Sequence, residues 1–205
     1  MSRALAVAAC CFVGCGLFPD LSFLEGPRDG SDDASSDADT GASDAGQNDD
    51  SGANLVPNST FDTDCSDWTV FQATLTPDPD AHTGARSCRV CRETGNLYSI
   101  DEVDGVLPVP KVNQSWHAHG WVKLPSGGRA HAAAIYLRTW DAADMKQLDI
   151  VSGGDVTLST SWQPLDVDFT DTMANAAILD VFVSASNAQA GDCFLVDDVT
   201  VVRTN

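Results

Sequence analysis

The chain has 205 residues and a formal net charge of −19, from 30 acidic and 11 basic residues. Nucleic acids and anionic membrane surfaces attract basic surfaces, so this composition argues against binding either of them by charge. The length is sufficient for one domain of ordinary size with additional segments.

The N-terminus has the layout of an export signal. A short basic start precedes an apolar run over residues 4–13, which is too short to span a bilayer. The sequence Phe12-Val13-Gly14-Cys15 resembles the lipobox of bacterial lipoproteins, in which signal peptidase cuts before a Cys that carries the lipid. Phe12 stands where Leu is usual. The resemblance implies a lipoprotein signal peptide over residues 1–14 and a lipid on Cys15.

Other interpretations of this stretch stay open. Val7-Ala8-Ala9-Cys10 fits the lipobox pattern better but leaves almost no apolar core before it. The stretch is also compatible with an ordinary secretory signal or a misplaced start codon. If Cys15 carries the lipid, the next residue is Gly16, not the Asp that retains lipoproteins at the inner membrane of enteric bacteria. We therefore expect an exported protein, lipid-anchored at the outer membrane or cell surface.

Residues 29–53 contain no side chain larger than Gln and no aliphatic side chain beyond Ala. Such a segment cannot bury enough apolar surface to offset the entropy of ordering, and its many Asp residues repel one another. A calcium-binding EF-hand loop would require a Glu, which this segment lacks. We therefore predict that residues 15–53 comprise the lipidated Cys and a disordered tether rich in Asp, Ser, Ala and Gly.

The remainder of the chain, residues 54–205, has no strong helix pattern. Short runs rich in β-branched and aromatic residues alternate with clusters of Gly, Pro, Asp and Asn, which is typical of sandwiches and jelly rolls. We predict an all-β domain with strands over residues 68–75, 86–91, 97–100, 116–123, 132–140, 148–151, 155–158, 163–169, 178–184 and 194–202.

Two adjacent carboxylates, Asp197 and Asp198, lie in the middle of the last apolar run. Successive strand residues point to opposite faces, so we expect at least one of the two to face protein. A buried carboxylate requires a cation, hydrogen-bond donors or a proton. The other interpretation is a solvent-facing pair on an edge strand, where charges discourage aggregation.

Several segments of this domain, in their order and spacing, resemble the cenC-type carbohydrate-binding modules. These modules are galactose-binding-like jelly rolls attached to many bacterial glycoside hydrolases. The resemblance covers residues 54–205 and implies a jelly-roll β-sandwich of the galactose-binding-domain type. The segments that carry it are residues 54–62 (Asn-Leu-Val-Pro-Asn-Ser-Thr-Phe-Asp), Trp68, residues 81–87, residues 116–123, Ser161-Trp162 and residues 194–199.

Modules of this family commonly hold a structural calcium ion. Its ligands are the acidic residue after the opening Asn motif, an Asp of the terminal Asp pair, and loop carbonyls. Calcium takes about six to eight oxygen ligands of these kinds. The resemblance thus implies a structural Ca²⁺ that joins the first and last strands, although Asp62 stands where the family usually has the longer Glu. The implied ligands are Asp62, Asp198 in preference to Asp197, and carbonyls near Asn58 and Thr83.

Four Cys residues of the domain form an even set, which suggests two disulfides in a chain predicted to be exported. Cys88 and Cys91 lie on one predicted strand and point to opposite faces, so they are poor partners for each other. The family resemblance makes their strand antiparallel to the last strand. It therefore implies the pair Cys91–Cys193, which leaves Cys65 to pair with Cys88.

A mixture of aromatic rings and hydrogen-bonding groups suits a sugar, because rings stack on its C–H face while polar groups bind its hydroxyls. The predicted strands over residues 116–123 and 132–140 carry this mixture on their non-core faces, and we expect them to be neighbours. The alternative is that Trp121 and Tyr136 fill the second half of the sandwich, under a loop. The predicted glycan contacts are Trp121, Tyr136 and Trp140 as stacking platforms and His119 and Arg138 as polar groups.

Other aromatic and imidazole groups receive structural assignments. Trp68 and Trp162 stand at core positions of the family, so we expect them to pack in the interior. His117 and His119 share a strand face and could bind zinc only with a third ligand, which is not evident in the sequence. We therefore expect a surface pair.

No motif of a common enzyme class occurs: the sequence lacks Gly-x-Ser-x-Gly, a phosphate-binding loop and His-Glu-x-x-His. No pair of carboxylates is singled out for glycoside hydrolysis. We therefore expect a non-catalytic lipoprotein that binds a poly- or oligosaccharide through an aromatic face. The alternative is a structural or adhesion lipoprotein whose jelly roll contacts a protein partner.

Overall fold

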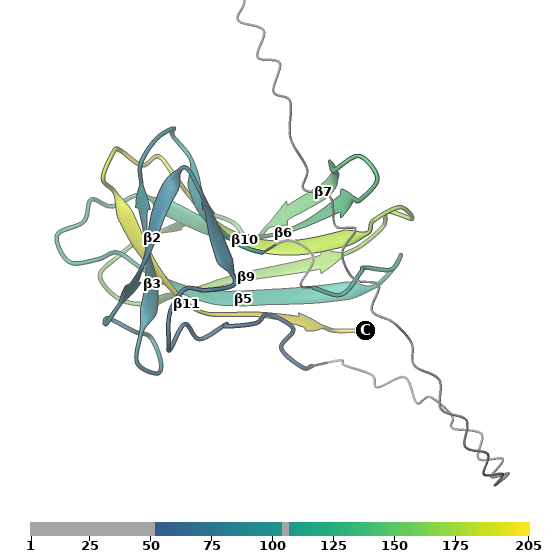
Figure 1. The fold of residues 1–205 in the computed structure, drawn as a ribbon, viewed down its shortest axis with the longest axis horizontal. Helices are drawn as coiled ribbons and strands as arrows, with labels where there is room; N and C mark the ends of the chain where they lie inside the picture. The colour runs from purple at the N-terminus through teal and green to yellow at the C-terminus, as the bar shows by residue number, and fades with distance from the viewer. Residues whose placement is uncertain (1–51, 104–106) are drawn as a thin grey trace, which may run out of the picture. The chain divides into compact units, whose positions relative to one another are not determined.

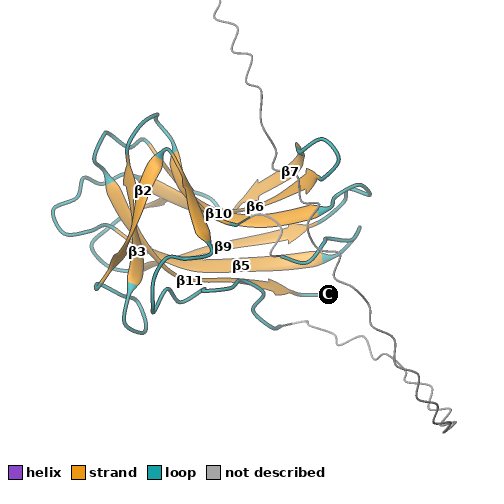
Figure 2. Ribbon diagram, in the orientation of Figure 1, coloured by secondary structure: helices purple, strands orange, loops and turns teal. Residues whose placement is uncertain are grey.

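The structure, a computed structural model, describes residues 52–103 and 107–205. The predicted signal peptide, Cys15 and nearly all of the predicted tether lie outside these residues. The described residues form eleven β-strands joined by turns and loops (Figures 1 and 2). Among them, no helix is long and apolar enough to cross a lipid bilayer.

The strands form two antiparallel sheets, which we call sheet A and sheet B. Sheet A has the order β2-β3-β11-β5-β9. Its strands are β2 (Ala73–Asp78), β3 (Ser87–Arg92), β11 (Cys193–Arg203), β5 (Ser115–Lys123) and β9 (Gln163–Thr170).

Sheet B has the order β1-β4-β10-β6-β7, and β8 also pairs with β6. The two sheets form the all-β sandwich that the sequence predicts. The strands of sheet B are β1 (Trp68–Phe71), β4 (Tyr98–Glu102), β10 (Ile178–Ser186), β6 (Ala132–Asp141), β7 (Lys146–Ser152) and β8 (Val156–Thr157).

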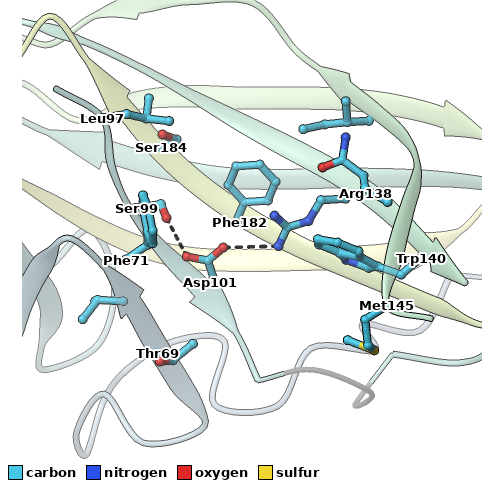
Figure 3. Close-up of a pocket in the computed structure, with 13 residues that line it drawn as sticks. Thr69, Phe71, Leu97, Ser99, Asp101, Arg138, Trp140, Met145, Phe182 and Ser184 are labelled. Carbon is cyan, nitrogen blue, oxygen red and sulfur yellow. Dashed lines mark hydrogen bonds and ion pairs between the residues drawn. The ribbon is translucent and has the colours of Figure 1, made fainter. Parts of the chain in front are cut away.

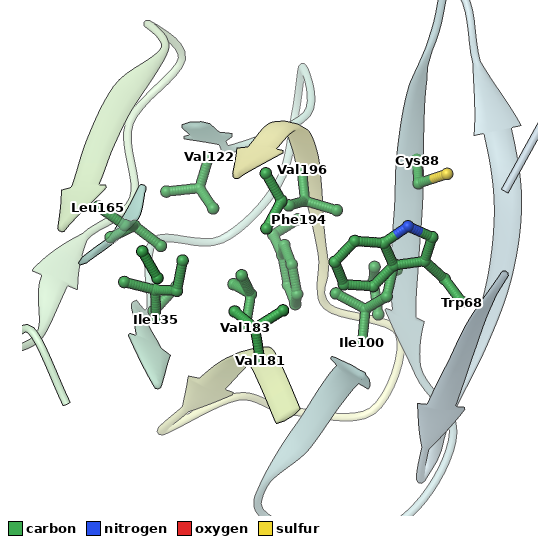
Figure 4. Packing of buried hydrophobic residues seen from close by; sticks show 14 of the residues in the cluster. Trp68, Cys88, Ile100, Val122, Ile135, Leu165, Val181, Val183, Phe194 and Val196 are labelled. Carbon is green, nitrogen blue, oxygen red and sulfur yellow. The ribbon is translucent and has the colours of Figure 1, made fainter. Parts of the chain in front are cut away.

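The inner faces of the two sheets enclose one apolar core (Figure 4). In β5 the residues alternate strictly between buried and half-buried, so Trp116, Ala118 and Val122 enter the core while the residues at the alternate positions face outward. Val181 and Val183 of β10 are fully buried in the same core. Burial of each such aliphatic side chain stabilises the fold by about 1.5–3 kcal/mol. Trp68, only 6% exposed, packs in the core as predicted.

One predicted strand is two strands in the structure. Residues 68–75 divide at Gln72, where the chain leaves sheet B and enters sheet A. Gln72 has a φ of 56°, a left-handed conformation that interrupts a strand and is uncommon for residues other than Gly. No Gly or Pro marks this position, so the sequence pattern does not reveal it. The predicted strand over residues 155–158 is reduced to the two-residue β8.

The expected pairing of the strands at residues 116–123 and 132–140 is wrong. β5 pairs with β11 and β9, whereas β6 pairs with β10, β7 and β8. The segment between them carries the chain from sheet A to sheet B and does not form a hairpin. The outward faces of β5 and β6 therefore lie on opposite sides of the sandwich, and the single binding face predicted across them does not exist.

Both disulfides implied by the family resemblance are present. Cys91 and Cys193 occupy directly paired positions of β3 and β11, with Cα atoms 4.1 Å apart. Cys65, which precedes β1, is bonded to Cys88 of β3, with Cα atoms 6.0 Å apart. Each disulfide thus includes a cysteine of β3, a strand of sheet A.

Candidate functional site

The outer face of sheet B contains a cleft of about 680 Å³ that is lined by β1, β4, β10, β6 and β7. This volume lies within the range of about 300–1,000 Å³ that is typical of ligand sites. Figure 3 shows Phe71 on one side, Trp140 and Met145 on the other, and Phe182 and Arg138 between them. The cleft therefore extends across the strands.

Alternation along β6 and β10 produces this lining. Leu137 of β6 and Val183 of β10 are buried in the core, so Arg138 and Phe182, their neighbours in sequence, point outward into the cleft. Arg138 and Asp180 are paired in register across β6 and β10. Their side chains therefore meet on the outer face of the sheet.

Arg138 is fixed at the centre of the cleft. Its Nε and Nη2 donate to the carboxylate of Asp180 at 2.8–3.1 Å, and Nη2 also lies 3.4 Å from Oδ1 of Asp101. Its guanidinium carbon lies 4.6 Å from the ring centroid of Trp140 and 4.5 Å from that of Phe182. Such bidentate and cation–π contacts hold a side chain in one orientation. The centre of the cleft is therefore preorganised.

Asp180 connects this cation to the nearest tryptophan. It is 1% exposed and also accepts a hydrogen bond of 2.8 Å from Nε1 of Trp140. Trp140 is thereby anchored at its indole nitrogen while its ring lines the cleft. The structure thus places two of the predicted glycan contacts, Arg138 and Trp140, side by side in one site.

Tyr136 occupies a different position from the one predicted. Its ring stacks on Phe182 with centroids 4.6 Å apart and planes 5° apart, and it is not among the residues that line the cleft. Burial raises the pKa of its hydroxyl. Phe71, 53% exposed, lines the cleft but was not predicted. A signal for it exists in the sequence, since the alternation that buries Trp68 points Phe71 outward.

Trp121 lies on the outer face of sheet A, away from the cleft. The imidazole of His82, from the loop between β2 and β3, stacks on its ring at 3.9 Å with planes 16° apart. His119 meets the same ring edge-on at 5.5 Å and hydrogen-bonds Asp166 of β9 at 2.7 Å. A loop side chain thus covers one face of the Trp121 ring, as the alternative expected, but the ring lies outside the sandwich and does not fill it.

The expectation that Trp162 packs in the core is wrong. The residue is half-buried just before β9, with the ammonium of Lys123 at 5.6 Å from its ring centroid and His82 against its edge. Its ring packs against outward-facing side chains of sheet A, because it lies outside the strand whose alternation would direct it inward. Trp162 belongs to the same surface cluster as Trp121.

The His pair on β5 finds carboxylate partners across the strand interface. His117 and His119 are paired in register with Asp168 and Asp166 of β9 and hydrogen-bond them at 2.9 and 2.7 Å. Within residues 52–103 and 107–205, no group of three or more His, Cys, Asp or Glu side chains is arranged to hold a metal ion. The two imidazoles lie on the outer face of sheet A, each bonded to a carboxylate of β9.

Asp197 and Asp198 both bind the loop that contains His82 and Thr83. Asp197 is fully buried and accepts hydrogen bonds from the backbone N–H groups of His82 (2.7 Å) and Thr83 (3.3 Å). Burial, despite these bonds, raises the pKa of Asp197 to about 6. Asp198 accepts from the Thr83 hydroxyl and lies 2.7 Å from Nδ1 of His82.

A β-bulge explains why adjacent residues reach the same loop. The register between β11 and β5 shifts between Asp197 and Thr200, and Asp198 has a φ of 49°. The bulge breaks the simple alternation, so both carboxylates turn to one side. The expectation that at least one of the pair faces protein is confirmed by the buried Asp197. The alternative of a pair on an edge strand is wrong, because β11 lies between β3 and β5.

Asp62 holds the other end of the same loop. It accepts hydrogen bonds from the N–H of Ala85 at 2.6 Å and from the hydroxyl of Thr60 at 3.1 Å. Gly84, with a φ of 63°, allows this approach, because a Cβ there would lie 1.8 Å from Oδ1 of Asp62. Asn58 donates to two carbonyls of the following turn, and its own carbonyl accepts from the indole of Trp68 at 3.4 Å.

Three of the predicted calcium ligands, Asp62, Asp197 and Asp198, thus contact one loop. Thr83, expected to offer a carbonyl oxygen, directs its N–H and hydroxyl toward the two carboxylates. The calcium site stays a prediction.

No protein-family model matches the sequence, and no curated protein is similar to it. Solved structures do match in fold. The CBM22-1 xylan-binding domain of Paenibacillus barcinonensis Xyn10C is 14% identical, with a TM-score of 0.57 over 71% of this chain and 92% of that one. TmCBM61, solved with β-1,4-galactotriose, is 17% identical, with a TM-score of 0.50 over 73% of this chain and 98% of that one.

A larger catalytic protein also contains a similar fold. The MgGH51 α-L-arabinofuranosidase, solved with bound arabinose, is 16% identical, with a TM-score of 0.59 over 75% of this chain and 27% of that one. At these identities the similarity concerns the fold. The class of the domain is therefore a two-sheet antiparallel jelly roll that resembles carbohydrate-binding modules of the CBM22 and CBM61 types.

Proposed function

We propose that this protein binds a poly- or oligosaccharide in the cleft of sheet B and performs no chemistry on it. The observation that carries the proposal is the cleft itself, which presents the rings of Phe71 and Trp140 on either side of a fixed polar centre at Arg138. Rings and ordered polar groups in one concave site match the apolar faces and hydroxyls of a sugar. The xylan and galactotriose named for the similar structures support this ligand class.

Affinity electrophoresis tests the proposal. The purified protein is run through gels that contain xylan, β-1,4-galactan or a β-glucan, with a glycan-free gel as reference. We expect retardation on at least one glycan, and weaker retardation of Phe71→Ser. Val109→Ser is the matched control, since Val109 is also exposed but does not line the cleft. Unretarded migration in every gel would contradict the proposal.

We further propose that the protein is exported and held at the outer membrane or cell surface by a lipid on Cys15, with residues 15–53 as the tether. The support is the sequence pattern of the N-terminus. Labelling with palmitate tests this: label should enter the wild type and Cys10→Ala but not Cys15→Ala. Loss of label in Cys10→Ala alone would assign the lipid to Cys10. An unlabelled wild type would exclude a lipid anchor.

A structural calcium ion at Asp62 and Asp198 is a third part of the proposal, supported by the family resemblance and by the convergence of these residues on one loop. Such an ion would join the first and last segments of the domain. Thermal melting in excess calcium and in EGTA tests it. We expect a lower Tm in EGTA for the wild type and no difference for Asp62→Ala. An equal Tm of the wild type in calcium and in EGTA would contradict the proposed calcium site.

The second candidate function is adhesion to a protein partner. One observation favours it: the cleft is lined in part by exposed aliphatic side chains, Leu97, Met145 and Ile150. Exposed apolar surface of this kind also marks protein interfaces. A partner that binds the protein and is not displaced by any glycan of the panel would favour this function over the first.

A further inference from the structure

The charged groups of the cleft are few and unequal in sign. Among the residues that line it, only Asp101 and Arg138 are charged, and Asp180 is buried against Arg138. Two carboxylates therefore accompany one guanidinium. The whole chain adds to this field, since its net charge is −19.

The guanidinium is already committed to protein carboxylates. Arg recognises an anion most strongly when two parallel N–H groups bind it together. In this cleft Nε and Nη2 make that bidentate contact with Asp180, and Nη2 also faces Asp101. Only Nη1 has no hydrogen bond to the described residues. Nη1 is an NH2 group whose two N–H donors can bind sugar hydroxyls.

Asp101 is oriented as an acceptor inside the cleft. Its Oδ2 accepts a hydrogen bond of 2.6 Å from the Ser99 hydroxyl, and its Oδ1 faces Nη2 of Arg138. Figure 3 shows the carboxylate between Phe71 and Arg138. An ionised carboxylate accepts hydrogen bonds from sugar hydroxyls but repels an anionic group placed beside it.

We infer that the cleft selects uncharged glycans over carboxylated ones, and that Asp101 is a specificity-determining residue for this choice. The inference rests on the proposed function, because it assigns a chemical class to the ligand of the same cleft. Asp101 offers an acceptor to neutral sugars and a like charge to acidic ones. Arg138 cannot offer an acidic sugar the bidentate contact from Nε and Nη2, because Asp180 already holds these two nitrogens.

The test compares three forms of one polysaccharide: unmodified xylan or β-1,4-galactan, the carboxymethylated form, and the hydroxyethylated form as an uncharged derivative of similar size. Affinities are measured by titration calorimetry at low and high salt. At low salt we expect the carboxymethylated form to bind at least tenfold more weakly than the hydroxyethylated form. High salt should reduce this difference in affinity, since it screens the repulsion between Asp101 and the carboxymethyl groups.

Two variants assign the effect to the cleft. Asp101→Asn keeps the shape of the side chain and removes its charge. It should therefore reduce the difference in affinity between the carboxymethylated and hydroxyethylated forms at low salt. Asp168→Asn removes a carboxylate whose side chain is 89% exposed on the opposite face, so it should leave this difference in affinity unchanged.

The possible failures are distinguishable. Absence of binding to any of the three forms would overturn the proposed function. Binding of the carboxymethylated form as tightly as the hydroxyethylated one would overturn the charge selection and leave glycan binding intact. A difference in affinity that does not change with salt would also overturn the charge selection. This measurement uses the wild type alone, so it does not depend on the folding of a variant.

Discussion

The outer faces of the two sheets are built from similar side chains with different results. Both carry a Trp and a cation at outward positions of a long central strand, Trp121 and Lys123 on β5 and Arg138 and Trp140 on β6. On sheet A, His82 from a loop stacks on the Trp ring and covers one of its faces. On sheet B the Trp is held at its edge by Asp180 and its ring lines a cleft. Aromatic content alone therefore does not locate a binding site.

The two sheets also differ in how they are reinforced. Among the described residues, both disulfides involve strands of sheet A, and the loop after β2 is fixed to this sheet by Asp197 and Asp198. Sheet B has instead a central ion pair beneath its cleft. We interpret sheet A as the layer that stabilises the domain and sheet B as the layer that meets the ligand.

The largest expected effect concerns sheet A. Replacing Cys91 and Cys193 together by Ser removes a bond between residues 102 positions apart, so the unfolded chain gains conformational freedom. We expect a loss of about 4 kcal/mol in the free energy of unfolding, measured by urea denaturation. Glycan binding should persist below the transition, because the cleft lies on the other sheet. Unchanged stability, or binding lost from a folded variant, would contradict this division.

A smaller loss is expected on sheet B from Arg138→Ala. This change leaves Asp180 as a buried carboxylate without its cation, which costs about 3 kcal/mol. The matched control is Arg89→Ala on sheet A, where the Arg89–Asp78 pair is more exposed and its loss should cost about 1 kcal/mol. Chemical denaturation of both variants measures the difference. Equal losses of unfolding free energy in the two variants would show that burial of the Arg138–Asp180 pair does not increase its contribution to stability.

The pH dependence of stability should report on Asp197. Its pKa rises from an ordinary value of 3.8 to about 6 on folding, chiefly through burial. The folded protein therefore binds this proton more tightly than the unfolded chain, and the stability that it contributes at low pH is lost as the pH rises from about 4 to about 6. The loss is about 2–3 kcal/mol.

Subtracting the unfolding free energies of Asp197→Asn from those of the wild type, both in EGTA, isolates this contribution from other groups. The difference should fall between pH 4 and pH 6 and then stay level. A flat difference across this interval would mean that Asp197 titrates in the folded protein as it does in the unfolded chain.

Local patterns in the sequence predicted much of the fold. The alternation of β5 is complete within nine residues, so its core face could be assigned without knowledge of its neighbours. The disulfides followed from the family resemblance. The switch at Gln72 could not be predicted, because a left-handed residue between two β-type runs leaves no compositional mark.

The candidate site was harder to predict because it depends on contacts between distant segments. Arg138 and Trp140 were identified by alternation, but their partner Asp180 lies on β10 and is brought to them by strand pairing. Trp121 satisfied the same pattern and is covered by a loop residue distant in sequence. Periodicity thus tells which side chains point outward, and only tertiary structure tells which remain accessible.

Affinity of two matched Trp variants tests the central claim most directly. The dissociation constant of the best glycan of the panel is measured by calorimetry for the wild type, Trp140→Ala and Trp121→Ala, each verified as folded by circular dichroism. Trp140→Ala should bind at least tenfold more weakly, a change of about 1.4 kcal/mol, while Trp121→Ala should bind as the wild type does. Unchanged affinity in Trp140→Ala, or an equal loss in Trp121→Ala, would contradict a binding site on sheet B.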